Sequence, residues 1–179
     1  MIVDILEFLH LSQRPPSPAF LDELMTAYTR HVPWESAFRI AKRAAIAEAA
    51  ACPRWPEEIW RDAMERGGGG TCFESNYAFF HLLQALGFDG YLTINDMGES
   101  RGCHTAIVIR LGQARWLVDA GYPLYLPVPL DPNRPTQRAT DFHTYTATPL
   151  PDNRYEIQRD RHPKPYVFTL IDAPIDDAA

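Results

Sequence analysis

The chain has 179 residues, of which 46% are apolar and 22% charged, and its formal net charge at pH 7 is -6. This length allows one large domain or two small ones around a buried core. The acidic balance argues against a nucleic-acid partner, which would favour a basic protein face. Three cysteines do not suggest a disulfide framework, and this low count fits a reducing compartment.

Targeting and metal-binding patterns are not found in the sequence. The N-terminus contains Asp4 and Glu7 and has no basic start, so we expect no signal peptide. No apolar run approaches the ~20 residues that cross a membrane. There is no CxxC or HExxH spacing, so we expect no metal. These features predict a cytoplasmic protein without a membrane partner.

The first half of the chain has the patterns of helices. Ser17 followed by Pro18 is a typical helix start, because serine caps the first turn and proline fits its first position. Gly87 is a helix stop. The predicted helices cover residues 2–10, the segment from Pro18 to the break at 31–36, residues 35–50, residues 57–66, and the segment from Cys72 to Leu86.

After Gly87 the pattern changes to short β-branched or aromatic segments separated by turn residues. A run of helices followed by a run of strands predicts an α+β fold. Antiparallel strands of this number should close into a small β-barrel or a curved sheet. We therefore predict a helical bundle domain over residues 1–88 and a β-barrel domain over 89–179. The predicted strands are 91–95, 104–111, 115–120, 124–128, 142–147, 154–158 and 165–171.

Cys72 follows the glycine run 67–70 and lies at the start of a predicted helix. The free N–H groups and the dipole of a helix N-terminus favour negative charge. A thiol there loses its proton more easily, and the thiolate is the nucleophile. The glycines allow the backbone to come close to the sulfur and its target. A small buried cysteine before a helix is the structural alternative.

His104 and Asp119 fall on a predicted β-hairpin. With a two-residue turn at Leu111 and Gly112, Arg110 faces Gln113 and His104 faces Asp119. Directly opposed residues have Cβ atoms about 4.5–5.5 Å apart, close enough for an imidazole–carboxylate hydrogen bond. A slip of one residue would place the two on opposite faces. The alternative is a histidine capped by an acid at a sheet edge.

Together these three residues predict an activated thiol. His104 would take the proton of Cys72, and Asp119 would orient the ring and stabilise the imidazolium. Such a Cys-His-Asp core, like that of papain or the transglutaminases, occurs on unrelated folds and does not define the substrate. Cys103 is a rival nucleophile, but strand alternation places its side chain on the face opposite to His104.

The motif residues resemble a known family. Residues 69–76, Gly-Gly-Thr-Cys-Phe-Glu-Ser-Asn, are similar to the Arg-Gly-Gly-x-Cys-Phe-Glu-x-Asn signature of the arylamine N-acetyltransferases. His104 and the segment 118–122 follow in the family's order. Residues 32–36 resemble its Pro-Phe-Glu-Asn element, and 166–168 with Pro174 and Asp176 resemble its Tyr-x-Phe…Pro…Asp stretch.

The resemblance implies a helical bundle, a β-barrel, a third α/β lid domain and a triad formed by Cys72, His104 and Asp119. It also implies ping-pong transfer of an acetyl group from acetyl-CoA, as co-substrate, through a cysteine thioester. The acceptor would be a small aromatic amine, an arylhydrazine or an N-hydroxyarylamine.

Two departures from the family pattern affect these expectations. The arginine expected before the two glycines is Gly68, and Arg66 lies two residues further out. The chain also ends where the third domain would begin, which suggests a short form without the lid. An open site would let water compete for the acyl-enzyme. An exposed apolar surface there would favour a homodimer.

The sequence offers weaker candidates for ligand binding. Arg66 and Arg101 are near the site in sequence and could hold the phosphates of CoA. An aromatic acceptor could stack on Trp34, Phe38 or Tyr122, although each could equally be a core residue. The backbone N–H of Cys72 and one from the His104 region are the natural donors to an oxyanion.

Other functions remain open for the same three groups. The protein could be a cysteine hydrolase or a transglutaminase-like enzyme. It could form an amide from a larger, carrier-bound acyl thioester, which a cleft without a lid could admit. It could also be an inactive homologue that keeps the fold and binds a partner.

Overall fold

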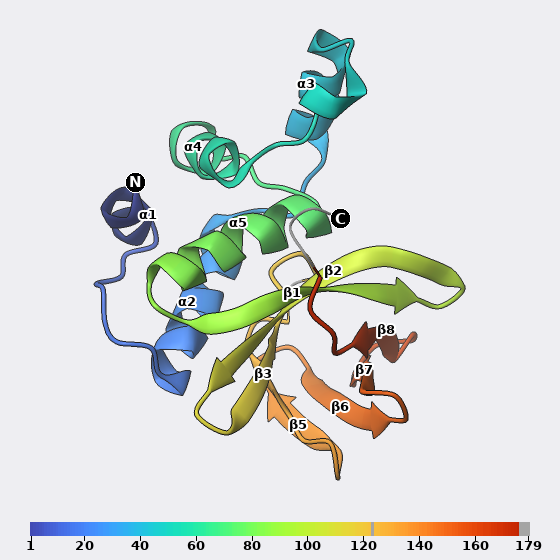
Figure 1. The fold of residues 1–179 in the computed structure, drawn as a ribbon. Coiled ribbons are helices and arrows are strands. Elements are labelled where there is room, and N and C mark those ends of the chain that lie inside the picture. Colours follow the sequence, from blue (N-terminus) through green and yellow to red (C-terminus); the bar gives the residue numbers. More distant parts are fainter. Residues whose placement is uncertain (123, 176–179) are drawn as a thin grey trace.

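The computed structural model describes residues 1–122 and 124–175. Within them five α-helices precede eight β-strands, which confirms the predicted α+β class (Figure 1). The helices are α1 (Ile2–Phe8), α2 (Pro18–His31), α3 (Ala37–Ala45), α4 (Pro56–Arg66) and α5 (Cys72–Ala85). The change from helix to strand falls between Ala85 and Asp89, and the division into two domains at residue 88 stays a prediction. Asp176 of the family motif lies outside the described residues.

Local sequence explains where the helices begin and end. The backbone N–H of Phe20 donates to Oγ of Ser17 at 3.2 Å and caps α2, as the Ser-Pro pair predicts. Helix α4 begins at Pro56 and ends at Arg66, and Gly67 caps it with a φ of +65°, which suits glycine.

The helix predicted over 35–50 is wrong in its second half. Helix α3 ends at Ala45, and a single 3-10 turn follows at Ala49–Ala51. Alanine favours helix, but α3 has no buried residue and projects away from the other helices (Figure 1). Because most helical stability comes from packing of an apolar face, a longer helix would gain little here.

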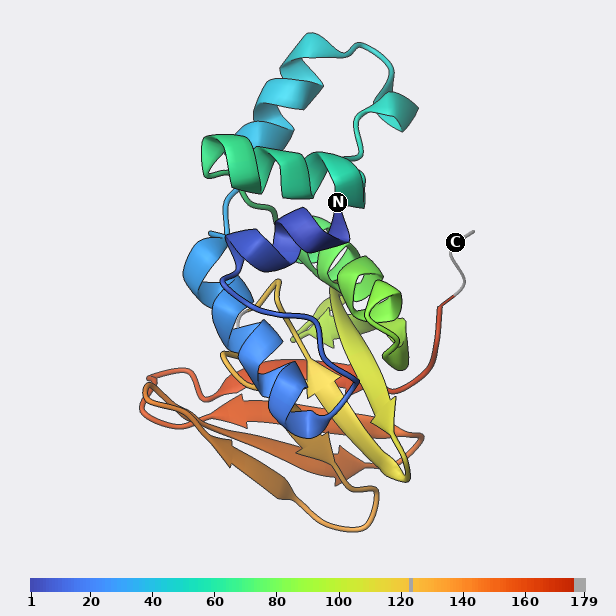
Figure 2. The same ribbon diagram turned by 90° about the vertical axis from the view of Figure 1, so that its left-hand side faces the viewer.

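Aromatic side chains hold α2, α4 and α5 together. The ring of Tyr28 lies 5.6 Å from Trp60 and 4.8 Å from Phe79, measured between centroids. The indole N–H of Trp60 donates to the carbonyl oxygen of Ala78 at 3.1 Å, so this buried polar group is satisfied. In Figure 2 α4 lies above the sheet, and α2 (blue) runs downward alongside α5 toward the strands.

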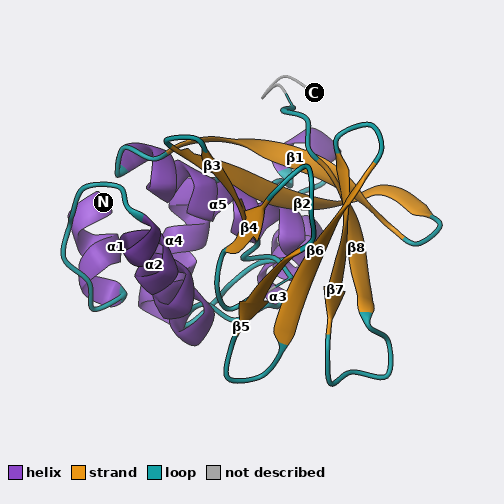
Figure 3. Cartoon of the chain, turned by 90° about the horizontal axis from the view of Figure 1, so that it is seen from below, coloured by secondary structure: helices purple, strands orange, loops and turns teal. Residues whose placement is uncertain are grey.

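The strands form one antiparallel sheet in the order β4-β3-β2-β1-β8-β7-β6-β5 (Figure 3). Thr136 of β5 donates its hydroxyl to the carbonyl oxygen of Pro129 in β4, so the two outer strands meet and the sheet is nearly closed. The strands are β1 (Asp89–Met97), β2 (Ser100–Leu111), β3 (Ala114–Val118), β4 (Val128–Leu130), β5 (Thr136–Ala139), β6 (Thr144–Leu150), β7 (Arg154–Arg159) and β8 (Tyr166–Ile171).

Two strands differ from the prediction. The strand expected at 124–128 begins only at Val128, and β5 was not predicted. Both are short, and β5 reads Thr-Gln-Arg-Ala, which carries no alternating apolar pattern. They form because they complete the ring of strands, which local sequence does not reveal.

One continuous cluster of buried apolar side chains joins the helices to the sheet. Helix α5 is the middle layer, with Phe79 and Leu83 packed among the helices and the sheet's Ile107 and Val118 in the same cluster. This position places the start of α5 against the edge of the barrel. Within the described residues no helix is long and apolar enough to span a membrane.

Candidate functional site

The glycine run brings the start of α5 against the segment that follows α2. The N–H of Gly69 donates to Oε1 of Glu35 at 3.2 Å, and the N–H of Glu35 donates to the carbonyl oxygen of Gly70 at 3.2 Å. A Cβ at Gly69 would lie only 1.8 Å from the carbonyl oxygen of Pro33. Glycine is therefore required for this close approach of two backbones.

Cys72 is the first residue of α5 and is half-buried. The carboxylate of Glu74 accepts the N–H of Thr71 at 3.0 Å and its hydroxyl at 3.2 Å, which caps the helix. The sulfur of Cys72 lies 3.9 Å from the carbonyl oxygen of Cys103. The thiol therefore lies at the capped N-terminus of α5, beside strand β2.

His104 and Asp119 are both buried and in contact. Nε2 of His104 lies 2.6 Å from Oδ2 of Asp119, which leaves Nδ1 as the ring nitrogen available to the thiol. Burial lowers the pKa of His104, but the charge of Asp119 and the hydrogen bond with Cys72 outweigh it and raise the pKa to about 10. The imidazolium form therefore persists at neutral pH.

The hairpin register predicted for this contact is wrong by two residues. The turn is formed by Gly112 and Gln113, and Arg110 pairs with Arg115. Gly112 has a φ of +61°, which suits the first central position of a type II′ turn. Strand β3 ends at Val118, so Asp119 lies beyond the ladder.

The contact between His104 and Asp119 is nevertheless present because side chains alternate with a period of two. A shift of two residues leaves every side chain on the same face. Asp119, one residue beyond the ladder, therefore still reaches His104, although the inferred pairing was wrong.

Asn76 is a site residue whose role was not predicted from the sequence. It is fully buried, and its Nδ2 donates to Oδ1 of Asp119 at 2.9 Å and to the carbonyl oxygen of Thr105 at 2.6 Å. Its Oδ1 accepts the N–H of Ala120 at 2.8 Å. Residues four apart share a helix face, so Asn76 could have been placed one turn along from Cys72.

Of the three aromatic candidates, Tyr122 lies at the site. Its ring is 6.4 Å from that of His104 and nearly perpendicular to it. Phe38 instead packs under the guanidinium groups of Arg54 and Arg66, at 5.3 and 4.5 Å. Trp34 is 61% exposed and pairs through its backbone with the glycine run.

The two arginines proposed for the CoA phosphates lie at the surface. Arg66 ends α4 and donates to Oδ1 of Asp62 at 3.2 Å. Arg101 is an exposed residue near the start of β2. The side chain of Arg66 is therefore paired within its own helix and is not directed to Cys72.

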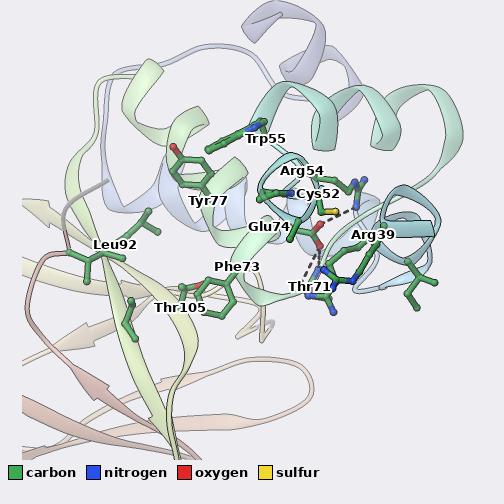
Figure 4. A pocket seen from close by; sticks show the side chains of 16 residues that line it. Arg39, Cys52, Arg54, Trp55, Thr71, Phe73, Glu74, Tyr77, Leu92 and Thr105 are labelled. Atoms are coloured by element: carbon green, nitrogen blue, oxygen red, sulfur yellow. Dashed lines mark hydrogen bonds and ion pairs between the residues drawn. The ribbon is translucent and has the colours of Figure 1, made fainter. Parts of the chain in front are cut away.

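A groove of about 720 Å³ runs beside the start of α5 (Figure 4). Arg39 and Arg43 line it at the α3 side, and Leu92 lies at the opposite end, with Phe73 between. Thr105 also lines it, and its hydroxyl donates to the carbonyl oxygen of Cys72 at 3.0 Å. The groove is therefore adjacent to the backbone of Cys72, although the side chains of Cys72 and His104 are not among its lining residues. It combines an apolar wall with the exposed Arg39 and Arg43 and the buried Arg54. Its other apolar and aromatic lining includes Ile40, Trp55, Tyr77, Ile94 and Ile175.

The part of the chain that the structure describes contains no group of three or more His, Cys, Asp or Glu residues that could hold a metal ion. The reactive groups that the geometry brings together are the thiol of Cys72, the imidazole of His104 and the carboxylate of Asp119.

This chain is similar to known proteins both in sequence and in structure. Proansamycin X synthase from Amycolatopsis mediterranei (strain S699) is 30% identical over 95 residues, which are 48% of this chain and 36% of that protein. The arylamine N-acetyltransferase from Salmonella typhimurium has a TM-score of 0.80 at 17% identity, over 99% of this chain and 65% of that one. The Mycobacterium marinum arylamine N-acetyltransferase in complex with CoA has a TM-score of 0.81 at 17% identity, over 99% and 68%.

These structural similarities, at such low identity, show the fold. The chain spans about a third of the length of the synthase and about two thirds of each of the two solved structures. The sequence model of the N-acetyltransferase family matches residues 19–178, nearly the whole chain. The chain therefore belongs to the arylamine N-acetyltransferase family.

Proposed function

We propose that this protein transfers an acetyl group from acetyl-CoA, through a thioester on Cys72, to the nitrogen of an arylamine or a related amine. The observation that carries the proposal is the contact of 2.6 Å between His104 and the buried Asp119, beside the thiol of Cys72. Membership of the family supports acetyl transfer as the reaction. The CoA complex of the Mycobacterium marinum enzyme supports CoA as the carrier.

In the first half of the proposed reaction, the thiolate of Cys72 attacks the thioester carbonyl. A new C–S bond forms to Cys72, and the bond to the sulfur of CoA breaks. The imidazolium of His104 gives its proton to the leaving thiolate. Asp119 keeps the ring oriented and stabilises it while it is charged.

In the second half, the amine nitrogen attacks the acyl-enzyme. A C–N bond forms, neutral His104 accepts the proton of the amine, and the Cys72 thiolate leaves. The enzyme returns to its starting thiolate–imidazolium form with no net change. The N–H of Cys72, at the N-terminus of α5, is our candidate donor to the oxyanion in both halves.

We place the CoA portion of the donor in the groove of Figure 4. Arg39 and Arg43 line one side and suit phosphate groups, whereas the apolar side suits the pantetheine arm. Arg66 is not assigned to this role, because Asp62 already engages it and it does not line the groove. Tyr122, beside His104, remains the best-placed aromatic residue for the acceptor.

A second candidate function is amide formation from a larger acyl thioester. The groove is far larger than an acetyl group requires, and the relative from Amycolatopsis mediterranei is named a synthase of proansamycin X. This reaction would use the same three groups with a longer acyl chain in the groove.

Intact mass spectrometry after incubation with acetyl-CoA tests the proposal. We expect an acetyl adduct that is absent in Cys72→Ser and that disappears when an arylamine is added, with formation of the amide. The same assay with octanoyl-CoA tests the second candidate. Release of CoA at a rate independent of amine would indicate a hydrolase. No adduct from either donor, with slow alkylation of Cys72 at neutral pH, would overturn acyl transfer.

A further inference from the structure

Arg54 is a buried cation that the reaction described above does not use. It lies in the connection before α4, and its side chain is 1% exposed. A buried charge is costly unless it is paired and hydrogen-bonded, so its partners show what it organises.

The partners of Arg54 come from each segment around the start of α5. Nη2 lies 2.7 Å from Oδ2 of Asp62, and Nη1 donates to the carbonyl oxygen of Gly69 at 2.8 Å. Nη1 also lies 3.7 Å from a carboxylate oxygen of Glu35 and 3.7 Å from one of Glu74. One guanidinium thus links α4, the glycine run, the segment after α2, and α5.

Two of these partners control the backbone next to Cys72. Glu35 accepts the N–H of Gly69, and Glu74 caps α5 by accepting the N–H of Thr71. Oε1 of Glu74 is buried and has no hydrogen-bond partner within the described residues. The nearby charge of Arg54 is therefore the interaction that offsets the burial of this oxygen.

We propose that Arg54 is a positioning residue for Cys72, which rests on the proposed role of Cys72 as nucleophile. By holding Gly69 and Glu74 at once, Arg54 fixes the peptide groups on both sides of Cys72. This sets the direction of the thiol toward His104 and of the Cys72 N–H toward the reacting carbonyl. Without Arg54, the carbonyl oxygen of Gly69 would lose its donor, and the carboxylates of Glu35 and Glu74 would lose the cation between them.

Arg66 provides a matched control. It contacts the same carboxylate, that of Asp62, and packs on the same ring, that of Phe38. Its side chain is 63% exposed, however, and within the described residues it forms no hydrogen bond or ion pair with the glycine run or Glu74. Arg66→Met therefore shows the effect of losing an arginine from Asp62 and Phe38 alone, and Arg54→Lys shows the effect of keeping the charge, whereas positioning of Cys72 should appear only at Arg54.

The experiment measures alkylation of Cys72 by iodoacetamide, with peptide mapping to separate it from Cys52 and Cys103. Wild type, Arg54→Lys, Arg54→Met and Arg66→Met are compared across pH, at a temperature where circular dichroism shows each variant folded. We expect Arg54→Met to react about 10- to 100-fold more slowly, as for a reacting group displaced by about 1 Å. Its rate profile should also move to higher pH, and kcat should fall by more than KM rises.

Arg54→Lys keeps the charge but cannot reach Asp62 and Gly69 together, because lysine lacks the planar fork. We expect an intermediate loss, and Arg66→Met should stay within about twofold of wild type. If Arg54→Met does not fold, the alkylation rate of Cys72 in Arg54→Lys tests the proposal instead. Wild-type alkylation rates in the folded Arg54 variants, or an equal loss in Arg66→Met, would overturn the proposal. Alkylation needs no acyl donor, so this result is independent of whether acetyl transfer is found.

Discussion

Nδ2 of Asn76 donates to Oδ1 of Asp119 at 2.9 Å, joining α5 to a loop 43 residues further along the chain. The same oxygen accepts the N–H groups of Gly121 and Tyr122 at 3.0 and 2.8 Å. Oδ2 is thereby left to face Nε2 of His104. The carboxylate of Asp119 is therefore held in one orientation. It in turn holds the imidazole of His104 toward Cys72.

We expect Asn76→Ala to lower both stability and turnover. The change leaves the carbonyl oxygen of Thr105 and the N–H of Ala120 without their present partner, at a cost of about 1–3 kcal/mol in the free energy of unfolding. Asp119 gains rotational freedom, so kcat should fall by about tenfold with a smaller change in KM. Urea unfolding and steady-state kinetics measure the two effects.

Asn133→Ala is a suitable control for this change. Asn133 is exposed in the turn between β4 and β5, and its replacement should alter stability by no more than about 0.5 kcal/mol. Unchanged kcat in Asn76→Ala would show that Asp119 does not need its helix partner.

Gly121→Ala should disable the site through a steric clash. A Cβ at Gly121 would lie 2.3 Å from Cα of Cys72 and 2.8 Å from Nδ2 of Asn76. Because backbone is involved, the start of α5 must move, at a cost of about 1–3 kcal/mol. We expect a large loss of kcat, measured together with the melting temperature.

The control for this clash is Gly98→Ala. Gly98 has a φ of +61° and no atoms within 4 Å of its Cβ position, so alanine costs about 1–2 kcal/mol of backbone strain alone. Both variants should melt earlier, but only Gly121→Ala should lose activity. Equal kcat in the two variants would show that the close packing of Gly121 against the backbone of Cys72 does not matter for activity.

The sequence predicts those parts of the fold that depend on local pattern. Ser17 and Pro18 begin α2 as expected, and Cys72 begins α5, because caps and helix starts are set by a few neighbouring residues. Strand β5 was missed because its polar sequence gains its place only from closing the sheet.

The site was accessible to sequence reasoning only in part, for a similar reason. His104 and Asp119 could be brought together because alternation tolerates an error of two residues in the register. Arg54 could not be identified, because its partners Glu35, Asp62 and Glu74 are assembled by the tertiary fold. No local pattern distinguishes such an arginine from a solvated one.

The raised pKa of His104 predicts a pH-dependent contribution to stability. Burial lowers this pKa, but Asp119 and Cys72 raise it from 6.5 to about 10. A group whose pKa is higher in the folded state stabilises the fold fully below its unfolded pKa, and this contribution is lost as pH rises toward the folded value. The stability advantage of wild type over His104→Gln should therefore shrink between pH 6.5 and 10.

Urea unfolding at pH 6, 8 and 10 measures this difference. Asp119→Asn is the informative comparison, because it removes the charge that raises the pKa of His104. In the Asp119→Asn background, the change in the free energy of unfolding caused by His104→Gln should vary much less over this pH range. Parallel stability curves for wild type and His104→Gln would contradict a protonated His104 at neutral pH.

The cations of the groove yield a prediction about the donor. Arg39 and Arg43 are exposed and line the groove beside the start of α5. If they hold the phosphates of CoA, Arg39→Ala with Arg43→Ala should raise KM for acetyl-CoA by about threefold to tenfold, as expected for exposed charge pairs, with little change in kcat. Added salt should reduce the difference, because it screens exposed charges.

Two comparisons make this prediction specific. S-acetylpantetheine lacks the nucleotide phosphates, so its KM should be the same in wild type and in the double variant. Arg134→Ala removes an exposed cation between β4 and β5, which is not among the groove-lining residues, and should leave KM for acetyl-CoA unchanged. An equal increase in KM for both donors would mean that the arginines shape the groove and do not bind phosphate, and the CoA phosphates would then have to lie elsewhere.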